Sequence, residues 1–107
     1  MIRYKIDIMK TLTEHGFSRQ KLRDHKIMSQ ATLQSITDAW RVQTLPESEI
    51  QQDPALCRRR DKGIQGITLE TINKICIMCG LKVEDIVEVV PSDDEILRMY
   101  RVKNGYV

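Results

Sequence analysis

The segment SRQKLRDHKIMSQATLQSI, residues 18–36, constrains the fold more than any other part of this sequence. Ser18 and Ser29 are each placed to cap the start of a helix. Leu22 gives the first helix its apolar contact, while Leu33 and Ile36 give the second an apolar face. These signals predict two short helices joined by a tight turn, a pairing that lets the second helix enter a DNA major groove.

The second of these helices is predicted to be long. Leu33, Ile36 and Trp40 follow one another at helical spacing, so we expect the helix to run from Ser29 to about Thr44 and to stop before Pro46. Trp40 is then predicted to anchor the segment that follows. An exposed tryptophan in a dimer interface is the alternative.

The rest of the chain also predicts helices. Residues 46–66 carry two prolines and two glycines and are expected to hold one or two short helices, with Asp53 as a cap. Thr68 is expected to cap a helix that ends at Gly80 and has one apolar face; the face consists of Leu69, Ile72, Ile75, Cys76 and Cys79. Residues 83–86 read as a helical turn.

Strand and terminal signals complete the prediction. The N-terminus and residues 87–90 are β-prone and can form a short two-stranded sheet, and Ser92 and Glu95 form a capping box. Asn104 and Gly105 carry a hairpin signal, but too few residues follow them to form a proper second strand, so no hairpin is expected there. The sum is a mainly α fold of five or six short helices with one pair of strands.

Composition narrows the class of protein. A chain of 107 residues is typical of one domain. No apolar run approaches the roughly 18 residues of a membrane span, and no signal peptide is evident, so we expect no membrane partner and a cytoplasmic location. The three cysteines are an odd number, which argues against a disulfide framework.

Charge is distributed unevenly along the chain. The net charge is only +2, but residues 1–45 carry eight Lys/Arg against four Asp/Glu, whereas residues 67–107 carry five against seven. The basic excess therefore lies in the half that holds the helix pair, as binding to nucleic acid would require.

The helix pair supplies the candidate contacts to double-stranded DNA. With Leu33 and Ile36 facing inward, the outward residues expected to contact bases are Gln30, Ala31, Gln34 and Ser35. Those expected to contact phosphates are Ser18, Arg19, Gln20, Lys21 and Thr32. Polar surface residues of any helical bundle would follow the same spacing, so spacing alone leaves both interpretations open.

Two separated blocks of sequence add a resemblance. The pattern MIRYKID…G-F-S-x-x-x-L…S-Q-A-T-L-x-x-I in residues 1–37, and ITLETINKIC with EDIVEVVP in residues 67–91, resemble small Cro/lambda-repressor-like transcriptional regulators of bacteria and phages. The resemblance implies a five-helix DNA-binding domain that acts as a homodimer on palindromic sites, usually as a repressor. It also implies that residues 42–66 are an insertion, and residues 92–107 an extension, of one domain spanning residues 1–107.

Three residues depart from the family pattern. Arg23 replaces an alanine, Lys26 an apolar residue and Ile27 the glycine of the turn. We expect Arg23 to direct its side chain outward, and Ile27 with Met28 to supply the contact that Lys26 does not. The turn is therefore expected to be reshaped.

The insertion carries a run of basic residues. Arg58, Arg59, Arg60 and Lys62 can form an accessory basic patch that contacts a flanking phosphate or the minor groove. A solvated helix face, partly neutralised by Asp61, is the alternative and is favoured because short charge runs usually lie on the surface.

The remaining motifs do not predict an enzyme. Cys76 and Cys79 lack further ligands nearby, so we expect no metal, and cysteines that act as small buried hydrophobes; a thiol-redox enzyme is a distant third interpretation. No cofactor or catalytic constellation is predicted.

The main hypothesis is a sequence-specific DNA-binding regulator. The rival is a helix-turn-helix scaffold used as a protein-interaction module, such as a phage-borne inhibitor or an antitoxin, with a protein partner.

Overall fold

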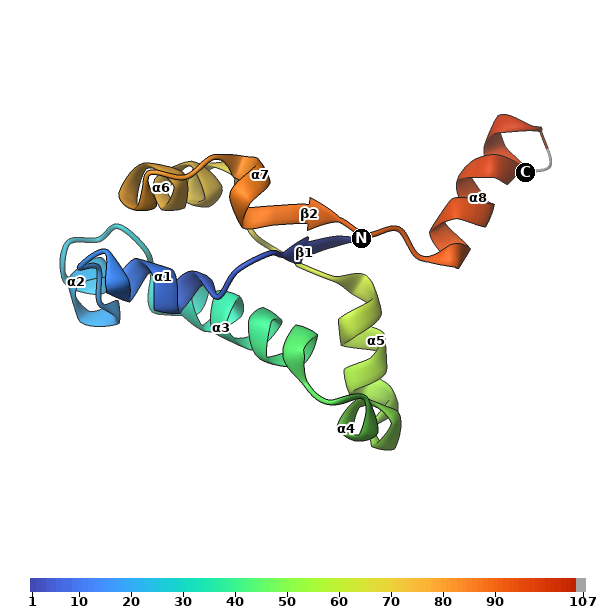
Figure 1. Ribbon diagram of the computed structural model, residues 1–107, viewed down its shortest axis with the longest axis horizontal. Coiled ribbons are helices and arrows are strands. Elements are labelled where there is room, and N and C mark those ends of the chain that lie inside the picture. The colour runs from blue at the N-terminus through green and yellow to red at the C-terminus, as the bar shows by residue number, and fades with distance from the viewer. Residues whose placement is uncertain (106–107) are drawn as a thin grey trace.

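The computed structural model describes residues 1–105, and Figure 1 shows how its elements are arranged. In chain order the elements are β1 (Ile2–Tyr4), α1 (Ile8–Glu14), α2 (Arg19–Asp24), α3 (Gln30–Thr44), α4 (Glu47–Gln52), α5 (Pro54–Lys62), α6 (Leu69–Cys79), α7 (Val83–Ile86), β2 (Val87–Val89) and α8 (Asp93–Lys103). The fold is mainly helical, as predicted. Residues 1–105 hold eight helices, more than the five or six expected.

The start of each main helix is fixed by local chemistry. The hydroxyls of Ser18, Ser29 and Thr68 accept hydrogen bonds from backbone N–H groups in the first turns of α2, α3 and α6. Each bond satisfies a donor that a helix start would otherwise leave unpaired. The three predicted caps are confirmed, and so is the end of α3 at Thr44.

The segment after α3 folds into two helices, as predicted. Asp53 caps α5, with Pro54 at its first position. At the end of α5 the backbone turns sharply at Gly63, whose φ is +69°. A Cβ there would lie 2.4 Å from the carbonyl oxygen of Ile2, so only glycine allows the chain to pass this close to β1.

The predicted pair of strands is present. β1 and β2 are antiparallel, with Ile2 opposite Val89 and Tyr4 opposite Val87. The other edge of β1 is joined to α3, because the Gln43 side chain donates to the Tyr4 carbonyl at 2.6 Å and accepts from its N–H at 3.0 Å. The small sheet thus links both ends of the folded body to the long helix.

One apolar core joins β1 to five of the helices. Tyr4 lies in this core, where burial raises the pKa of its phenol to about 12. The buried helical residues of this core come from α1, α2, α3, α6 and α7; they are Ile8, Leu12, Leu22, Leu33, Ile36, Ile75, Cys79 and Ile86. Neither α4, α5 nor α8 contributes a buried residue to it.

One prediction about the C-terminal half was wrong. Leu69 was expected on the core face of its helix, but it is the first residue of α6 and is 84% exposed. Asn104 is the C-terminal cap of α8 and Gly105 has a φ of +78°, so these residues end a helix and do not begin a hairpin. The last two residues of that motif, Tyr106 and Val107, lie outside the described part of the chain.

Trp40 was also placed wrongly by the sequence. It lies against the core and lines a cleft with α1 residues such as Met9 and Lys10, on the side of α3 away from the insertion. The α3 residues that face α5 are instead Ala39, Val42 and Gln43. Helix α3 packs against α1 as well as α5, and the apolar spacing of its residues does not predict which of the two Trp40 contacts.

None of the helices within residues 1–105 combines the length and the apolar character needed to cross a membrane.

Candidate nucleic-acid interface

The first element of the candidate interface is the start of α2. Ser18 accepts a hydrogen bond from the Lys21 N–H at 3.2 Å, and Gln20 is exposed beside it. The Lys21 ammonium is also exposed and donates to the Gly16 carbonyl at 3.3 Å. The N–H groups of the first turn and the Lys21 cation thus lie together on the surface, where they can bind an anion.

Arg19 has an additional structural role. Its guanidinium donates to the hydroxyl of Thr37, in the middle of α3. This bond ties the start of α2 to α3 and fixes part of their relative position. Because a guanidinium has five N–H donors, others remain for a phosphate, and the contact predicted for Arg19 stays a prediction.

The turn between α2 and α3 is reshaped, as predicted. Lys26 has a positive φ, of 55°, so the left-handed position of the turn falls on Lys26 and not on Ile27, which stands where the resembling family has glycine. Ile27 is partly buried and packs on the core, and Met28 is buried. Arg23 is exposed, as expected. The turn is reshaped because Ile27 is apolar and is better placed inside.

A lysine from a distant helix holds this turn. Lys74 of α6 donates to the Ile27 carbonyl at 3.0 Å, and its ammonium lies 3.5 Å from Glu70. The bond satisfies a carbonyl that the short turn leaves without a helical partner. Sequence analysis missed Lys74, since nothing in its local pattern points to a turn forty-seven residues earlier.

The outward face of α3 carries the four predicted base-contacting residues. Gln30, Ala31, Gln34 and Ser35 are all exposed, opposite the buried residues Leu33 and Ile36. They lie on adjoining turns of the helix and present amide, methyl and hydroxyl groups, the groups that major-groove recognition uses.

Asp38 continues this face toward the end of α3. The Gln34 amide donates to its carboxylate at 3.0 Å, and the carboxylate lies 4.0 Å from Arg41. Thr32, at the start of the helix, lies 3.0 Å from the Ser29 hydroxyl. The bond to Asp38 uses one of the two N–H donors of the Gln34 amide, so the second N–H and the carbonyl oxygen remain for a bidentate contact with a base.

The basic residues of the insertion divide into two groups. Arg60 is partly buried and lies 2.6 Å from Glu47 and 3.5 Å from Asp61, so it joins α5 to α4. Those three groups form a structural ion network. Arg58, Arg59 and Lys62 have exposed side chains on α5. The accessory patch is thus smaller than the run of four cations suggested.

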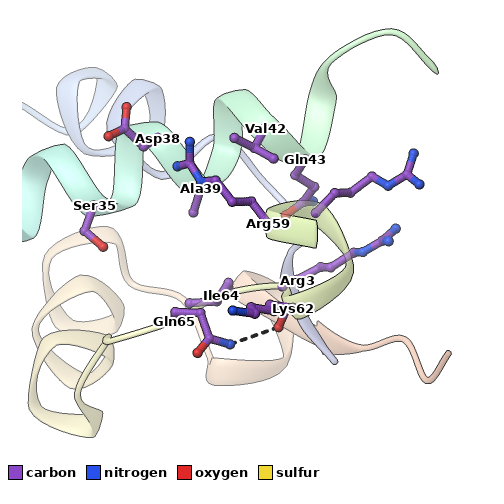
Figure 2. Close-up of a pocket in the computed structure, with 12 residues that line it drawn as sticks. Arg3, Ser35, Asp38, Ala39, Val42, Gln43, Arg59, Lys62, Ile64 and Gln65 are labelled. Carbon is purple, nitrogen blue, oxygen red and sulfur yellow. Dashed lines mark hydrogen bonds between the residues drawn. The ribbon is translucent and has the colours of Figure 1, made fainter. Parts of the chain in front are cut away.

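A cleft of about 360 Å³ lies between α3 and α5 (Figure 2). Ser35 and Asp38 line it from α3, and Arg59 and Lys62 line it from α5. Arg3 of β1 also lines it, and the Nε atom of Arg3 is buried without a hydrogen-bond partner. The cations of the insertion therefore lie directly beside the outward face of α3, which sequence analysis did not predict.

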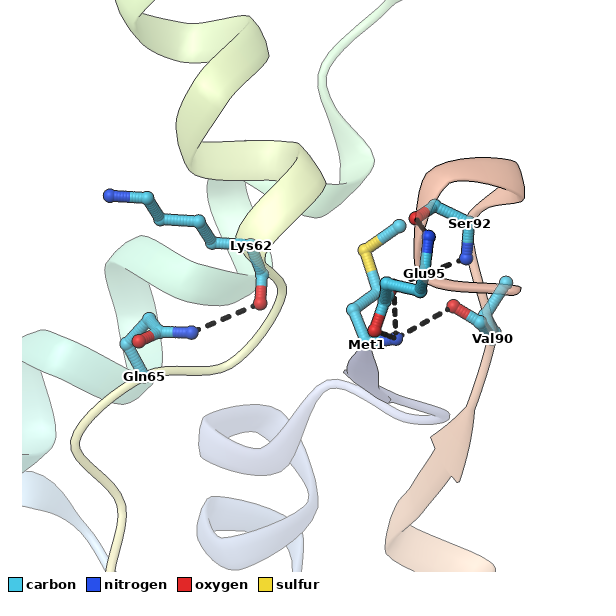
Figure 3. A network of polar contacts seen from close by, with 6 residues as sticks. All are labelled: Met1, Lys62, Gln65, Val90, Ser92 and Glu95. Carbon is cyan, nitrogen blue, oxygen red and sulfur yellow. Dashed lines mark hydrogen bonds and ion pairs between the residues drawn. The ribbon is translucent and has the colours of Figure 1, made fainter. Parts of the chain in front are cut away.

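The floor of this cleft is held by the loop after α5. The Gln65 side chain donates to the Lys62 carbonyl at 3.0 Å and so fixes the chain as it leaves the helix (Figure 3). Ile64 donates its N–H to the Ile2 carbonyl at 2.8 Å. Together these bonds keep α5 beside β1 and α3.

The two cysteines of α6 are free thiols that face the core. Cys79 is buried, and burial raises the pKa of its thiol, with a further contribution from neighbouring Cys76. Cys76 is partly buried and packs on the core. Among residues 1–105, no group of three or more His, Cys, Asp or Glu side chains is placed to hold a metal ion.

Comparison of the chain with protein-family models, with curated proteins and with solved structures found no match.

Proposed function

We propose that this protein is a sequence-specific regulator that binds double-stranded DNA, with α3 in the major groove, and that it acts as a repressor. The observation that carries the proposal is the outward row of Gln30, Ala31, Gln34 and Ser35 at the start of α3, behind a capped α2 and a tight turn. In a helix-turn-helix protein, the start of the second helix is the part that reaches base edges.

The composition of the core supports a lambda-repressor-like fold. The five helices that share one core are α1, α2, α3, α6 and α7, and they come from the two sequence blocks that resemble this family. Helices α4 and α5 lie between these blocks and α8 follows them. We therefore assign residues 42–66 as an insertion, and residues 92–107 as an extension, of a five-helix DNA-binding unit.

The insertion has a defined part in this proposal. Arg59 and Lys62 border the cleft beside Ser35, so they are placed to meet the phosphate backbone next to the groove that α3 enters. Such contacts add affinity at any sequence and increase its dependence on salt. Base recognition would remain with α3.

Selection from random duplexes at physiological salt tests the proposal. An enriched motif is expected, and Gln30→Ala should weaken binding to it by roughly 1–3 kcal/mol and relax the preference at one base pair. Lys21→Ala should weaken binding to all duplexes and lower the salt slope by about one. Gln51→Ala, an exposed glutamine on α4, is the matched control and should change neither property.

Failure to enrich any motif would favour the second candidate, a protein-interaction module. Two observations support that candidate. Asp38 places a carboxylate on the outward face of α3, and the cleft beside Trp40 carries both signs of charge, from Glu14 and Asp7 and from Arg19 and Arg41. This candidate would be supported if the wild-type protein bound no DNA and the Trp40→Ala variant lost binding to a protein partner.

A further inference from the structure

Helix α8 has a marked apolar face that touches no part of the core. Ile96, Met99 and Tyr100 follow one another at helical spacing, and Met99 and Tyr100 are 68% and 56% exposed. No residue of α8 is buried. Figure 1 shows the helix extending from one end of the molecule, away from the other elements. An isolated helix of eleven residues is marginal in water, so packing its apolar face against a partner would stabilise it.

The direction of α8 is fixed where it leaves β2 (Figure 3). The backbones of Met1 and Val90 exchange two hydrogen bonds, of 2.8 and 3.0 Å. The amino group of Met1 also donates to both carboxylate oxygens of Glu95, at 2.8 and 3.0 Å. These contacts hold the first turn of α8 past the end of the sheet, so the helix does not fold back onto its own chain.

A second unpartnered apolar surface lies on the same chain, around α7 and β2. It is an open groove of about 550 Å³ whose apolar lining is Ile2, Val83, Val87 and Val89. Val89 and Val83 are 73% and 54% exposed. We call this surface the β2 groove. Lys82, Glu84 and Glu88 form its polar margin.

The charges of the two surfaces are complementary. Helix α8 begins with Asp93 and Asp94 and ends with Arg101 and Lys103. The β2 groove is lined by one basic residue, Lys82, and by two acidic residues, Glu84 and Glu88. The basic end of a helix seated in the groove therefore has glutamates to pair with, and its acidic start has Lys82. Opposite charges at the margin of an apolar contact fix its direction.

We propose that the partner of α8 is a second copy of this chain, whose β2 groove receives it. In such a dimer, each copy gives its α8 to the groove of the other, so the contact occurs twice about a two-fold axis. Stable interfaces bury about 1,200–2,000 Å² in total, and this arrangement doubles what one short helix can bury. Each of the two contacts requires an intact α8 on one copy and an intact groove on the other.

The proposed interface leaves the candidate DNA-binding surface free. Helix α2 and the start of α3 lie at the end of the molecule opposite to α8 (Figure 1). The dimer would therefore present two helix pairs to a duplex without covering either. The inference concerns self-association alone and stands or falls separately from DNA binding.

Sedimentation equilibrium of the full chain without DNA tests the proposal. The wild-type protein should form dimers. Met99→Glu on α8 and Val89→Lys in the β2 groove should each give monomers, with unchanged helix content by circular dichroism, because both side chains are exposed. Gln51→Glu, on exposed α4, should remain dimeric.

Mixing the two monomeric variants gives the decisive result. One copy keeps an intact α8 and the other an intact groove, so the mixture should recover dimers through the one contact that is unchanged. Three results would overturn the proposal: a wild-type protein that stays monomeric, a single variant that stays dimeric, or a mixture that shows no dimer. A dimeric Val89→Lys protein would indicate that two α8 helices pair directly.

Discussion

Helices α3 and α8 begin in the same way but are used differently. Each starts with a serine whose hydroxyl accepts an N–H bond from the third residue of the helix, and each has an apolar face. Yet α3 buries Leu33, Ile36 and Val42, whereas α8 buries nothing. Local signals decide that a helix forms and where it starts. Whether its apolar face becomes core or interface depends on what the remaining chain places opposite to it.

The largest expected contrast between the two helices concerns apolar truncation. Leu33→Ala should destabilise the protein by about 2–5 kcal/mol, because it leaves a cavity in the core. Leu97→Ala on α8 should change the free energy of unfolding by less than about 0.5 kcal/mol in dilute, monomeric protein. Urea denaturation measures both. Equal losses would mean that α8 packs on its own chain in solution.

Removal of the two serine caps should affect different parts of the protein: one the global stability, the other a single helix. Ser29→Ala should lower the global free energy of unfolding by about 0.5–2 kcal/mol, since α3 is part of the core. Ser92→Ala removes an equivalent cap, but it should only reduce the helix content of α8 and leave the urea midpoint unchanged. Circular dichroism and denaturation on each variant separate these effects. A shift of the midpoint in the Ser92 variant would contradict the distinction.

A substitution in the turn before α3 should have a smaller effect on the free energy of unfolding, and it should stabilise the protein. Lys26→Gly should stabilise the protein by about 0.5–1 kcal/mol, because it relieves a non-glycine residue of its positive φ. Ile27→Gly is the matched control and should destabilise by about 1–2 kcal/mol through lost apolar burial. Stabilisation by the Ile27 variant instead would place the left-handed position at that residue.

The smallest expected effect is a pH dependence confined to the start of α8. The hydrogen bond from the Met1 amino group, with those from Ser92, lowers the pKa of Glu95 to about 2. A lowered pKa means that the contact favours the carboxylate, so it is complete above the ordinary pKa of glutamate and is lost as pH falls through about 2.

Carboxyl chemical shifts of Glu95 measured during an acid titration check this pKa. The Glu95→Gln variant should lose the pH dependence of α8 orientation while the amide signals of α3 stay unchanged. A midpoint near the ordinary value for glutamate would show that Glu95 does not contact Met1 in solution.

The sequence predicted features whose cause is local. Caps at Ser18, Ser29 and Thr68 depend on a side chain and the next few N–H groups, so they are visible in a short window. The short sheet was also predicted, since both strands are β-prone. The outward placement of Gln30 and Gln34 followed from the apolar spacing of Leu33 and Ile36.

Features that involve distant segments could not be predicted in the same way. Lys74 reaches the Ile27 carbonyl from a helix far along the chain, and Arg59 comes to lie beside Ser35 only because α5 packs against α3. Trp40 faced α1 instead of the insertion for the same reason. Apolar periodicity gives the side of a helix that is buried, but it does not name the neighbour.

By itself, the sequence determined that the chain is mainly helical, where the main helices begin, and which face of α3 looks outward, because caps and periodicity act within a few residues. Only the tertiary structure decided that Lys26 takes the left-handed position of the turn and that α8 buries no residue. It also decided that Arg60 forms an ion pair with Glu47, whereas Arg59 lines the cleft beside α3. These outcomes depend on contacts between segments that no local pattern relates, and their free energies are settled only when the segments meet.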